Sequence, residues 1–160
     1  MRVCVIERVE LGASPEALFD YITSIEGFQS FEGFGPIPGI GAVDVLEGEL
    51  STVGARMHVT NTDGSTHHER ILAADGPRRY AIRIHDLSSQ FRLLVKHVDE
   101  SWDITASGTG SGVVRTFEFT LRTPLAWPLS IPLAHGLFRA AMRRHHRRLA
   151  QRFGAERRIR

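Results

Sequence analysis

The chain has 160 residues, of which 42% are hydrophobic, and a formal net charge of +2 at pH 7. This length and apolar content suit one globular domain that buries about 70% of the surface of its unfolded chain. The single cysteine, Cys4, excludes an internal disulfide and a cluster of thiolate metal ligands. No apolar run approaches the roughly 20 residues of a membrane-spanning helix, and Glu7 and Arg8 interrupt any signal-peptide core, so we expect a cytoplasmic protein.

The first elements along the chain are a strand and one or two short helices. Apolar residues alternate with other residues over Val3–Leu11, which predicts a strand. Ser14 can cap the N-terminus of a helix, and Pro15 suits the first turn, where its missing N–H costs nothing. Gly27 permits a break in the helical pattern, and we expect a second short turn near Phe28–Phe31.

A loop rich in glycine and proline follows at Glu32–Gly41, with the sequence EGFGPIPGIG. Its glycines permit unusual backbone angles and its prolines restrict φ, so the loop has a defined shape. It carries three apolar side chains, Phe34, Ile37 and Ile40, which need a surface to cover. Two interpretations are open: a lid over the mouth of a cavity, or packing against the edge of a sheet.

The middle of the chain reads as consecutive antiparallel strands. Asp63-Gly64 between two strand patterns indicates a tight hairpin, and Gly76-Pro77 and the glycine-rich Ser107–Gly112 indicate further turns. The expected strands are Ala42–Glu49, Ala55–Asn61, Ser65–Ala74, Arg79–Asp86, Gln90–Ala106 (with a bulge) and Gly112–Arg122. The last one alternates most clearly, and we expect its inward face to hold Val113, Arg115, Phe117, Phe119 and Leu121.

One long amphipathic helix closes the domain. The pattern predicts a helix capped by Ser130 that runs to about Phe153, with Gly154 as its stop. Its apolar stripe, with His145 near the middle, consists of Ala134, Leu137, Phe138, Ala141, Met142 and Leu149. A curved sheet has one concave face to bury, and this helix is the element available to cover it.

The charge distribution is uneven. Residues 139–160 hold nine arginines and one acid, Glu156, which leaves 11 basic and 17 acidic residues in the rest of the chain. Such a block can attract phosphate surfaces, but runs of charge are usually solvated faces, so no specific nucleic-acid partner is expected. The apolar segment Leu125–Pro132 beside the arginines allows a third, weaker reading as a membrane-surface contact.

Several short motifs in this order resemble a known superfamily. They are ASPEALFDY (13–21), the glycine- and proline-rich loop, the Asp-Gly hairpin, GPRRY (76–80), ESWDI (100–104) and GTGSGVVRTFEF (108–119), followed by the closing helix. Together they resemble the START/SRPBCC superfamily, in its polyketide cyclase/dehydrase-like branch. The resemblance implies an α+β helix-grip fold: a curved antiparallel sheet of six to seven strands around a long C-terminal helix, with one or two short helices after the first strand. It implies one domain over residues 1–154 and a basic tail at 155–160.

The expected inward faces supply the candidate site residues. We expect a cavity for a hydrophobic ligand of several fused rings or an acyl chain, because small residues on the helix leave space there. The candidate ligand-binding residues are Phe34, Ile37, Ile40, Phe117, Phe119, Leu121, Phe138, Ala141 and Met142. The polar candidates on these apolar faces are His145, Arg115 and Glu7, which could polarise a carbonyl or move a proton. The alternative is that all three satisfy structural hydrogen bonds.

No metal site and no cofactor are predicted. His67-His68-Glu69 contains potential metal ligands, but neighbouring strand residues point to opposite faces and cannot bind one ion together without a bulge. The sequence lacks a nucleophile elbow and the glycine fingerprints that bind phosphate. The pattern does not decide which way His58, His67, Glu69, His85 and His97 face.

Two functions remain open from the sequence. The first is a binding module for a hydrophobic small molecule, lipid-like or polyketide-like. The second is a cyclase or dehydratase that acts on such a ligand, and it ranks lower because few acid-base groups can be placed inward. Fold resemblance does not choose between the two, and the oligomeric state is left open.

Overall fold

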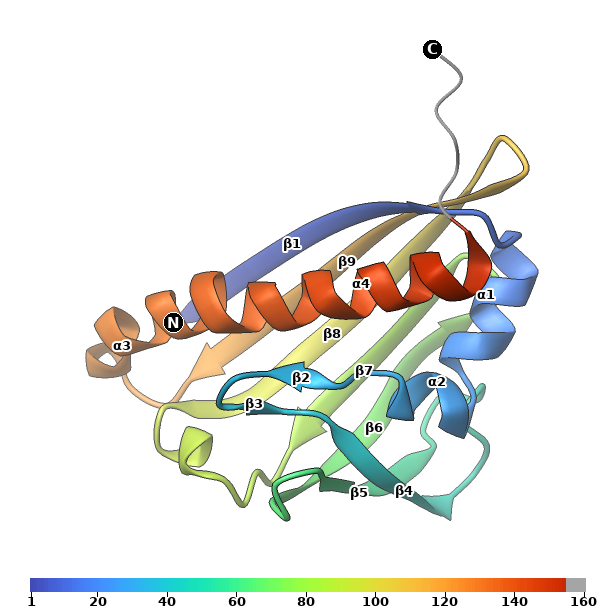
Figure 1. Cartoon of the computed structure of the whole chain (residues 1–160). Helices are drawn as coiled ribbons and strands as arrows, with labels where there is room; N and C mark the ends of the chain where they lie inside the picture. Colours follow the sequence, from blue (N-terminus) through green and yellow to red (C-terminus); the bar gives the residue numbers. More distant parts are fainter. Residues whose placement is uncertain (155–160) are drawn as a thin grey trace.

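A seven-stranded antiparallel sheet and a long C-terminal helix make up most of the molecule (Figure 1). The structure is a computed structural model, and it describes residues 1–154; the basic tail expected at 155–160 lies outside the described residues. In chain order the elements are β1 (Arg2–Leu11), α1 (Pro15–Ile22), α2 (Ile25–Gln29), β2 (Gly33–Phe34), β3 (Ile37–Pro38), β4 (Ile40–Glu47), β5 (Arg56–Asn61), β6 (Thr66–Asp75), β7 (Arg79–His85), the 3₁₀ turn η1 (Gln90–Leu93), β8 (Val95–Ser107), β9 (Gly110–Leu121), the 3₁₀ turn η2 (Pro124–Ala126), α3 (Trp127–Pro132), the π-helical η3 (Leu133–Phe138) and α4 (Arg139–Phe153).

The sheet is built from hairpins in sequence order. Its strand order is β1-β9-β8-β7-β6-β5-β4, so each strand from β4 to β9 pairs with the next, and β1 joins the end by pairing with β9. Asp63-Gly64 makes the predicted turn between β5 and β6, where Gly64 has a φ of +83°. The sheet curves, and α4 lies along its concave side (Figure 1). The helix-grip fold expected from the resemblance is therefore confirmed.

The C-terminal helix begins earlier than predicted, at Trp127, and α3, η3 and α4 follow one another without a break. Ser130 does not cap it, because its hydroxyl donates to the carbonyl of Ala126 at 2.7 Å. Pro128 lies in the first turn, where a missing N–H is tolerated, whereas Pro132 lies inside the helix and is followed by the wider π-helical segment. The helix ends at Phe153 as predicted, and Gly154 adopts a φ of +79°. No helix among the described residues is long and apolar enough to cross a membrane.

The loop expected at Glu32–Gly41 folds as a short hairpin of β2 and β3. The pairing of β2 with β3 needs glycine at position 33: φ of Gly33 is +73°, and a Cβ there would lie 2.1 Å from the carbonyl oxygen of Ile37. The hairpin turns Ile37 inward, with 5% of its surface exposed, and leaves Phe34 42% exposed. Ile37 of this hairpin is therefore part of the protein interior, whereas Phe34 at its tip stays at the surface.

The buried apolar side chains form two clusters. One includes Leu18, Phe28 and Tyr80 and lies where α1 and α2 meet the sheet. The other includes Val5, Phe117 and Met142 and lies beneath the first half of the C-terminal helix. Several buried charged and polar groups belong to neither cluster, and these define the site.

Candidate functional site

A cavity of about 150 Å³ is lined by the concave face of the sheet, α2, the β2–β3 hairpin and the C-terminal helix. The apolar side chains that line it include Phe28, Phe31, Ile37, Ile40, Ile82, Ile84, Val98, Phe117, Phe119 and Phe138. An apolar cavity of roughly this volume holds one benzene-sized ring. This volume is too small for the ligand of several fused rings that the sequence analysis allows.

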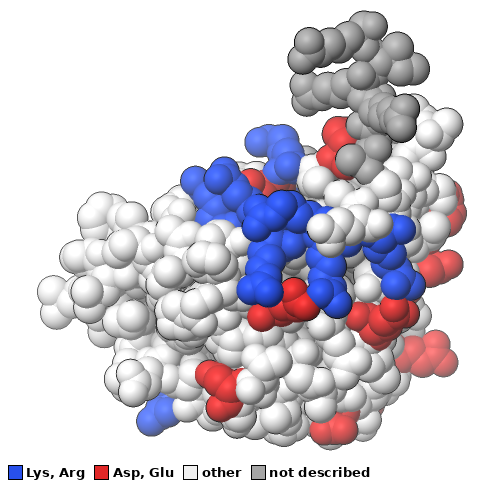
Figure 2. Space-filling view, viewed as in Figure 1, with Lys and Arg blue, Asp and Glu red and all other residues white. Residues whose placement is uncertain are grey.

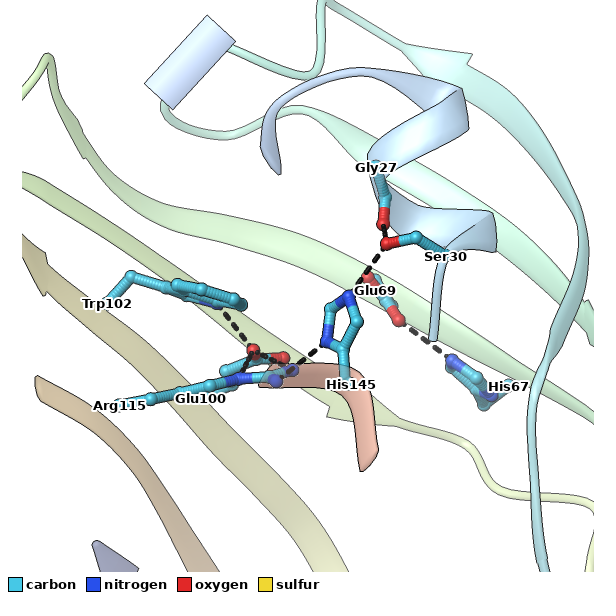
Figure 3. Close-up of polar contacts among 8 residues, drawn as sticks. All are labelled: Gly27, Ser30, His67, Glu69, Glu100, Trp102, Arg115 and His145. Carbon is cyan, nitrogen blue, oxygen red and sulfur yellow. Dashed lines mark hydrogen bonds and ion pairs between the residues drawn. The ribbon is translucent and has the colours of Figure 1, made fainter. Parts of the chain in front are cut away.

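Arg115 is the buried cation of the cavity wall, with 3% of its surface exposed. Its Nε and Nη2 lie 2.8 and 2.7 Å from one oxygen of Glu100, which also accepts a bond from Trp102 Nε1 at 2.5 Å. The guanidinium carbon stands 4.2 Å from the centroid of the Trp102 ring, within cation–π range. Burial raises the pKa of Glu100, and the Arg115 charge opposes that shift. The ion pair is therefore buried beside the Trp102 ring (Figure 3).

His145 extends this group from α4 toward α2. Arg115 Nη1 lies 2.8 Å from His145 Nδ1, and since arginine only donates, Nδ1 is an acceptor and carries no proton. The proton of the neutral ring is then on Nε2, which donates to Ser30 Oγ at 2.7 Å. Ser30 in turn donates to the carbonyl of Gly27 at 2.5 Å. Both ring nitrogens are thus engaged in a chain that ends on a backbone carbonyl.

A second buried polar group lies on β6. Glu69, 2% exposed, accepts a hydrogen bond from His67 Nε2 at 2.8 Å, and both residues line the cavity (Figure 3). On the other face of the sheet, the His68 ring stacks on His85 of β7 and meets the His58 ring of β5 edge-on. Within residues 1–154, no three His, Cys, Asp or Glu side chains are placed to hold one metal ion.

Burial keeps two neighbouring histidines of α4 neutral. Burial first, and the Arg115 charge second, lower the pKa of His145 well below its usual value and the pKa of His146 to about 3. The unfolded chain takes up protons on both rings as the pH falls through about 6.5, and the folded chain does not. The stability gained from their neutral form is therefore complete above pH ~6.5 and is lost progressively below it.

We expect each of these histidines to lower the free energy of unfolding by about 1.4 kcal/mol for each pH unit below pH ~6.5. His146→Leu should remove about half of their joint contribution to that slope, measured by urea unfolding at several pH values. Leucine suits the site because His146 Nε2 is buried without a hydrogen-bond partner among the described residues. Identical pH slopes for the two proteins would contradict this account.

The structure brings most of the predicted site residues to the cavity. His145 and Arg115 line it, as do Ile37, Ile40, Phe117, Phe119 and Phe138. Four predicted ligand-binding residues are not among the lining residues of the described chain: Phe34, Leu121, Ala141 and Met142. Phe34 is at the exposed hairpin tip, and the other three are buried where the helix packs on the sheet.

Glu7 was predicted to be a polar site residue on an inward apolar face, and the structure places its carboxylate outside the cavity lining. The two residues are directly opposite each other in the β1–β9 register. However, the carboxylate of Glu7 pairs with Arg139 at 2.9 Å and with Arg143 at 3.1 Å, and it does not line the cavity. Glu7 ties β1 to the helix and takes no part in the site.

The arginines of α4 also make ion pairs with the body of the protein. Arg144 and Arg148 contact Glu32, and Arg152 contacts Glu26 at 2.8 Å. Figure 2 shows basic side chains gathered over α4 on the viewed face, with acidic side chains beside them. Such exposed pairs contribute little stability individually, but they neutralise part of the basic block.

Four residues of the site were missed from the sequence: Glu69, Glu100, Trp102 and Ser30. A signal existed for two of them, because Val98, Glu100, Trp102 and Ile104 alternate on one face of β8 and are all buried. Ser30 gave no signal, since its role comes from the fold bringing α2 within reach of His145. Because both faces of β6 carry polar residues, the sequence does not show that Glu69 faces inward.

A curved sheet that grips a helix around a mainly apolar cavity defines a class of small-molecule-binding and small-molecule-processing domains. Residues 2–154 match the family described as polyketide cyclase / dehydrase and lipid transport, and the chain belongs to that family. The family description covers both enzymes and carriers of hydrophobic molecules. A comparison with curated protein sequences finds no match.

Solved structures with the same fold are numerous but distant in sequence. Norcoclaurine synthase from Thalictrum flavum is 14% identical with a TM-score of 0.67, over 95% of this chain and 88% of that one. Major latex-like protein 151 from Panax ginseng is 14% identical with a TM-score of 0.62, over 91% and 96%. Protein XoxI from Bacillus cereus is 18% identical with a TM-score of 0.64, over 94% and 95%. At these identities the likeness concerns the fold alone.

Proposed function

We propose that this protein binds a small, mainly apolar molecule, about the size of one substituted aromatic ring, in the cavity beneath its C-terminal helix. The observation that carries the proposal is the combination of an apolar cavity of about 150 Å³ with buried charged groups in its wall. Ligand sites typically combine apolar walls with a few fixed polar groups in this way.

The buried Arg115–Glu100 pair supports this function. Replacing a buried ion pair by apolar side chains is often neutral or stabilising, so the pair is a poor device for stability alone. Here it is fixed by Trp102 and His145 at the wall of an otherwise apolar space. A preorganised charged pair in such a place suits the orientation of a polar substituent on a ligand.

One of the similar structures provides a precedent for ligand size. The norcoclaurine synthase from Thalictrum flavum was solved in complex with dopamine and hydroxybenzaldehyde, each of which contains one aromatic ring. The same fold can therefore accompany one-ring ligands, which agrees with the volume of the cavity in this chain.

The geometry favours binding over a cyclase or dehydratase that relies on His145 and Glu7, the acid-base candidates of the sequence. A general base needs a free lone pair within reach of the proton it removes. His145 Nδ1 accepts from Arg115 and its Nε2 donates to Ser30, so the ring has no free position. Glu7, the third polar candidate, lies outside the cavity. Turnover of a supplied polyketone that disappears in His145→Ala would reverse this preference.

The proposal is tested by calorimetric titration of the protein with ethylbenzene, a one-ring probe without polar groups. We expect one saturable site per chain and a negative heat-capacity change, which marks burial of apolar surface. Native mass spectrometry of the freshly purified protein should reveal any ligand that co-purifies. Failure of ethylbenzene and of other one-ring compounds to bind would refute the proposed function.

A further inference from the structure

Glu69 has one carboxyl oxygen that no group of the protein satisfies. Oε1 accepts from His67 Nε2 at 2.8 Å, whereas Oε2 is fully buried and has no hydrogen-bond partner among the described residues. The residue is 2% exposed and lines the cavity. Figure 3 accordingly draws a single bond from this carboxyl group. A buried acceptor without a partner costs free energy, and such atoms are rare in folded proteins.

The orientation of this carboxyl group is fixed by a chain of hydrogen bonds. Asn61 Nδ2 donates to His67 Nδ1 at 3.3 Å and to Ser65 Oγ at 3.0 Å, and Ser65 Oγ donates to Asp63 at 2.6 Å. Because Nδ1 of His67 accepts, its Nε2 carries the proton and must donate to Glu69 Oε1. These hydrogen bonds connect the Glu69 carboxyl group to the β5–β6 turn and leave its Oε2 without a partner.

Most other polar side chains of the cavity already make hydrogen bonds or ion pairs within the protein. Arg115 and Glu100 pair with each other, His145 is bonded at both nitrogens, and the Tyr80 hydroxyl donates to the carbonyl of Leu50 at 2.6 Å. Among the described lining side chains, Glu69 Oε2 is the fully buried acceptor that has no partner, and a bound molecule can satisfy it.

We infer that Glu69 is a specificity-determining residue, and that the ligand is a one-ring molecule carrying a hydroxyl or N–H group that donates to Glu69 Oε2. This inference rests on the proposed function, since it needs a ligand in the cavity. It restricts that function further: among molecules of equal size, the cavity selects those with a donor. A site built to accept a hydrogen bond discriminates strongly against an analogue that lacks the donor, because its acceptor stays unpaired.

The test compares two isomers, 4-ethylphenol, which has a donor, and 4-methylanisole, which has none. Calorimetry on the unmodified protein should show 4-ethylphenol binding about tenfold more tightly, the effect of one hydrogen bond to a buried acceptor. 4-Ethylaniline tests whether N–H serves as well as O–H. This comparison needs no variant, so it does not depend on how a substitution affects folding.

The variant Glu69→Gln sharpens the test because it nearly preserves shape. The N–H of His67 still requires an acceptor, so the amide oxygen of glutamine takes that side and its NH₂ group faces the cavity. The preference for 4-ethylphenol should then disappear or reverse in favour of 4-methylanisole, which can only accept. Glu118→Gln is the matched control: Glu118 pairs with Arg2 at an exposed position, and the preference should persist.

The outcomes separate this inference from the proposed function. Equal affinity for the two isomers, or an unchanged preference in Glu69→Gln, would overturn the role of Glu69 while ethylbenzene binding still supported the cavity function. No binding of either isomer or of ethylbenzene would overturn both. A tenfold preference that is lost in Glu69→Gln and kept in Glu118→Gln is the result that the structure predicts.

Discussion

Replacing Arg115 by methionine is expected to lower the free energy of unfolding by about 3–5 kcal/mol, measured by urea denaturation at neutral pH. The substitution leaves the Glu100 carboxylate, 8% exposed, without its counter-charge. It also removes the donor to His145 Nδ1 and the cation–π contact with Trp102. An uncompensated buried charge is one of the few single changes with an effect of this size.

The double variant Arg115→Met/Glu100→Leu is the control for this prediction. It removes both charges and replaces them by apolar side chains, so it should recover most of the lost stability. If Arg115→Met were as stable as the unmodified protein, or if the double variant were less stable than the single one, the ion pair would not have the structural role described here.

Filling the cavity should abolish binding while the protein stays folded. Val98 is buried and lines the cavity, so Val98→Phe places additional ring atoms in the space that a ligand would occupy. We expect ethylbenzene affinity to fall by at least about 30-fold, because the burial of apolar surface that drives binding is lost. The cost of overpacking is about 1–3 kcal/mol, which a domain of this size tolerates.

Val45→Phe is the matched control for cavity filling. Val45 lies on β4, is 42% exposed and is not among the residues lining the cavity. The same substitution there should leave ethylbenzene affinity unchanged. Unaltered binding in Val98→Phe would show that the ligand binds at another place.

The sequence was sufficient to predict the architecture because its signals are local. Alternation of side chains, the Asp63-Gly64 hairpin and the apolar stripe of the last helix each reflect short-range geometry. The predicted start of the C-terminal helix was wrong for two reasons. Ser130 donates a hydrogen bond to the carbonyl of Ala126 and so does not cap the helix, and Pro132 is accommodated inside the helix. Capping and kinking depend on a few bonds that residue types alone do not determine.

The sequence predicted part of the site, namely the residues whose inward direction follows from strand or helix periodicity. Arg115, Phe117 and Phe119 follow from the inward face of β9, and His145 follows from the helix stripe. Glu7 shares the inward face of β1, yet Arg139 and Arg143 draw its carboxylate to the helix. Glu69 was missed because β6 is polar on both faces, and only tertiary structure shows which face is buried. A residue's face can be read from the sequence, whereas its partner across the fold cannot.

The central claim, that the cavity beneath the C-terminal helix is the ligand site, is tested most directly by diffraction from crystals soaked with iodobenzene. Iodine scatters anomalously, so its position is found without assumptions about the ligand. The account predicts one strong anomalous peak inside the cavity, among Phe117, Phe119 and Phe138. A peak confined to the molecular surface, in crystals of a protein that binds one-ring compounds saturably in solution, would contradict it.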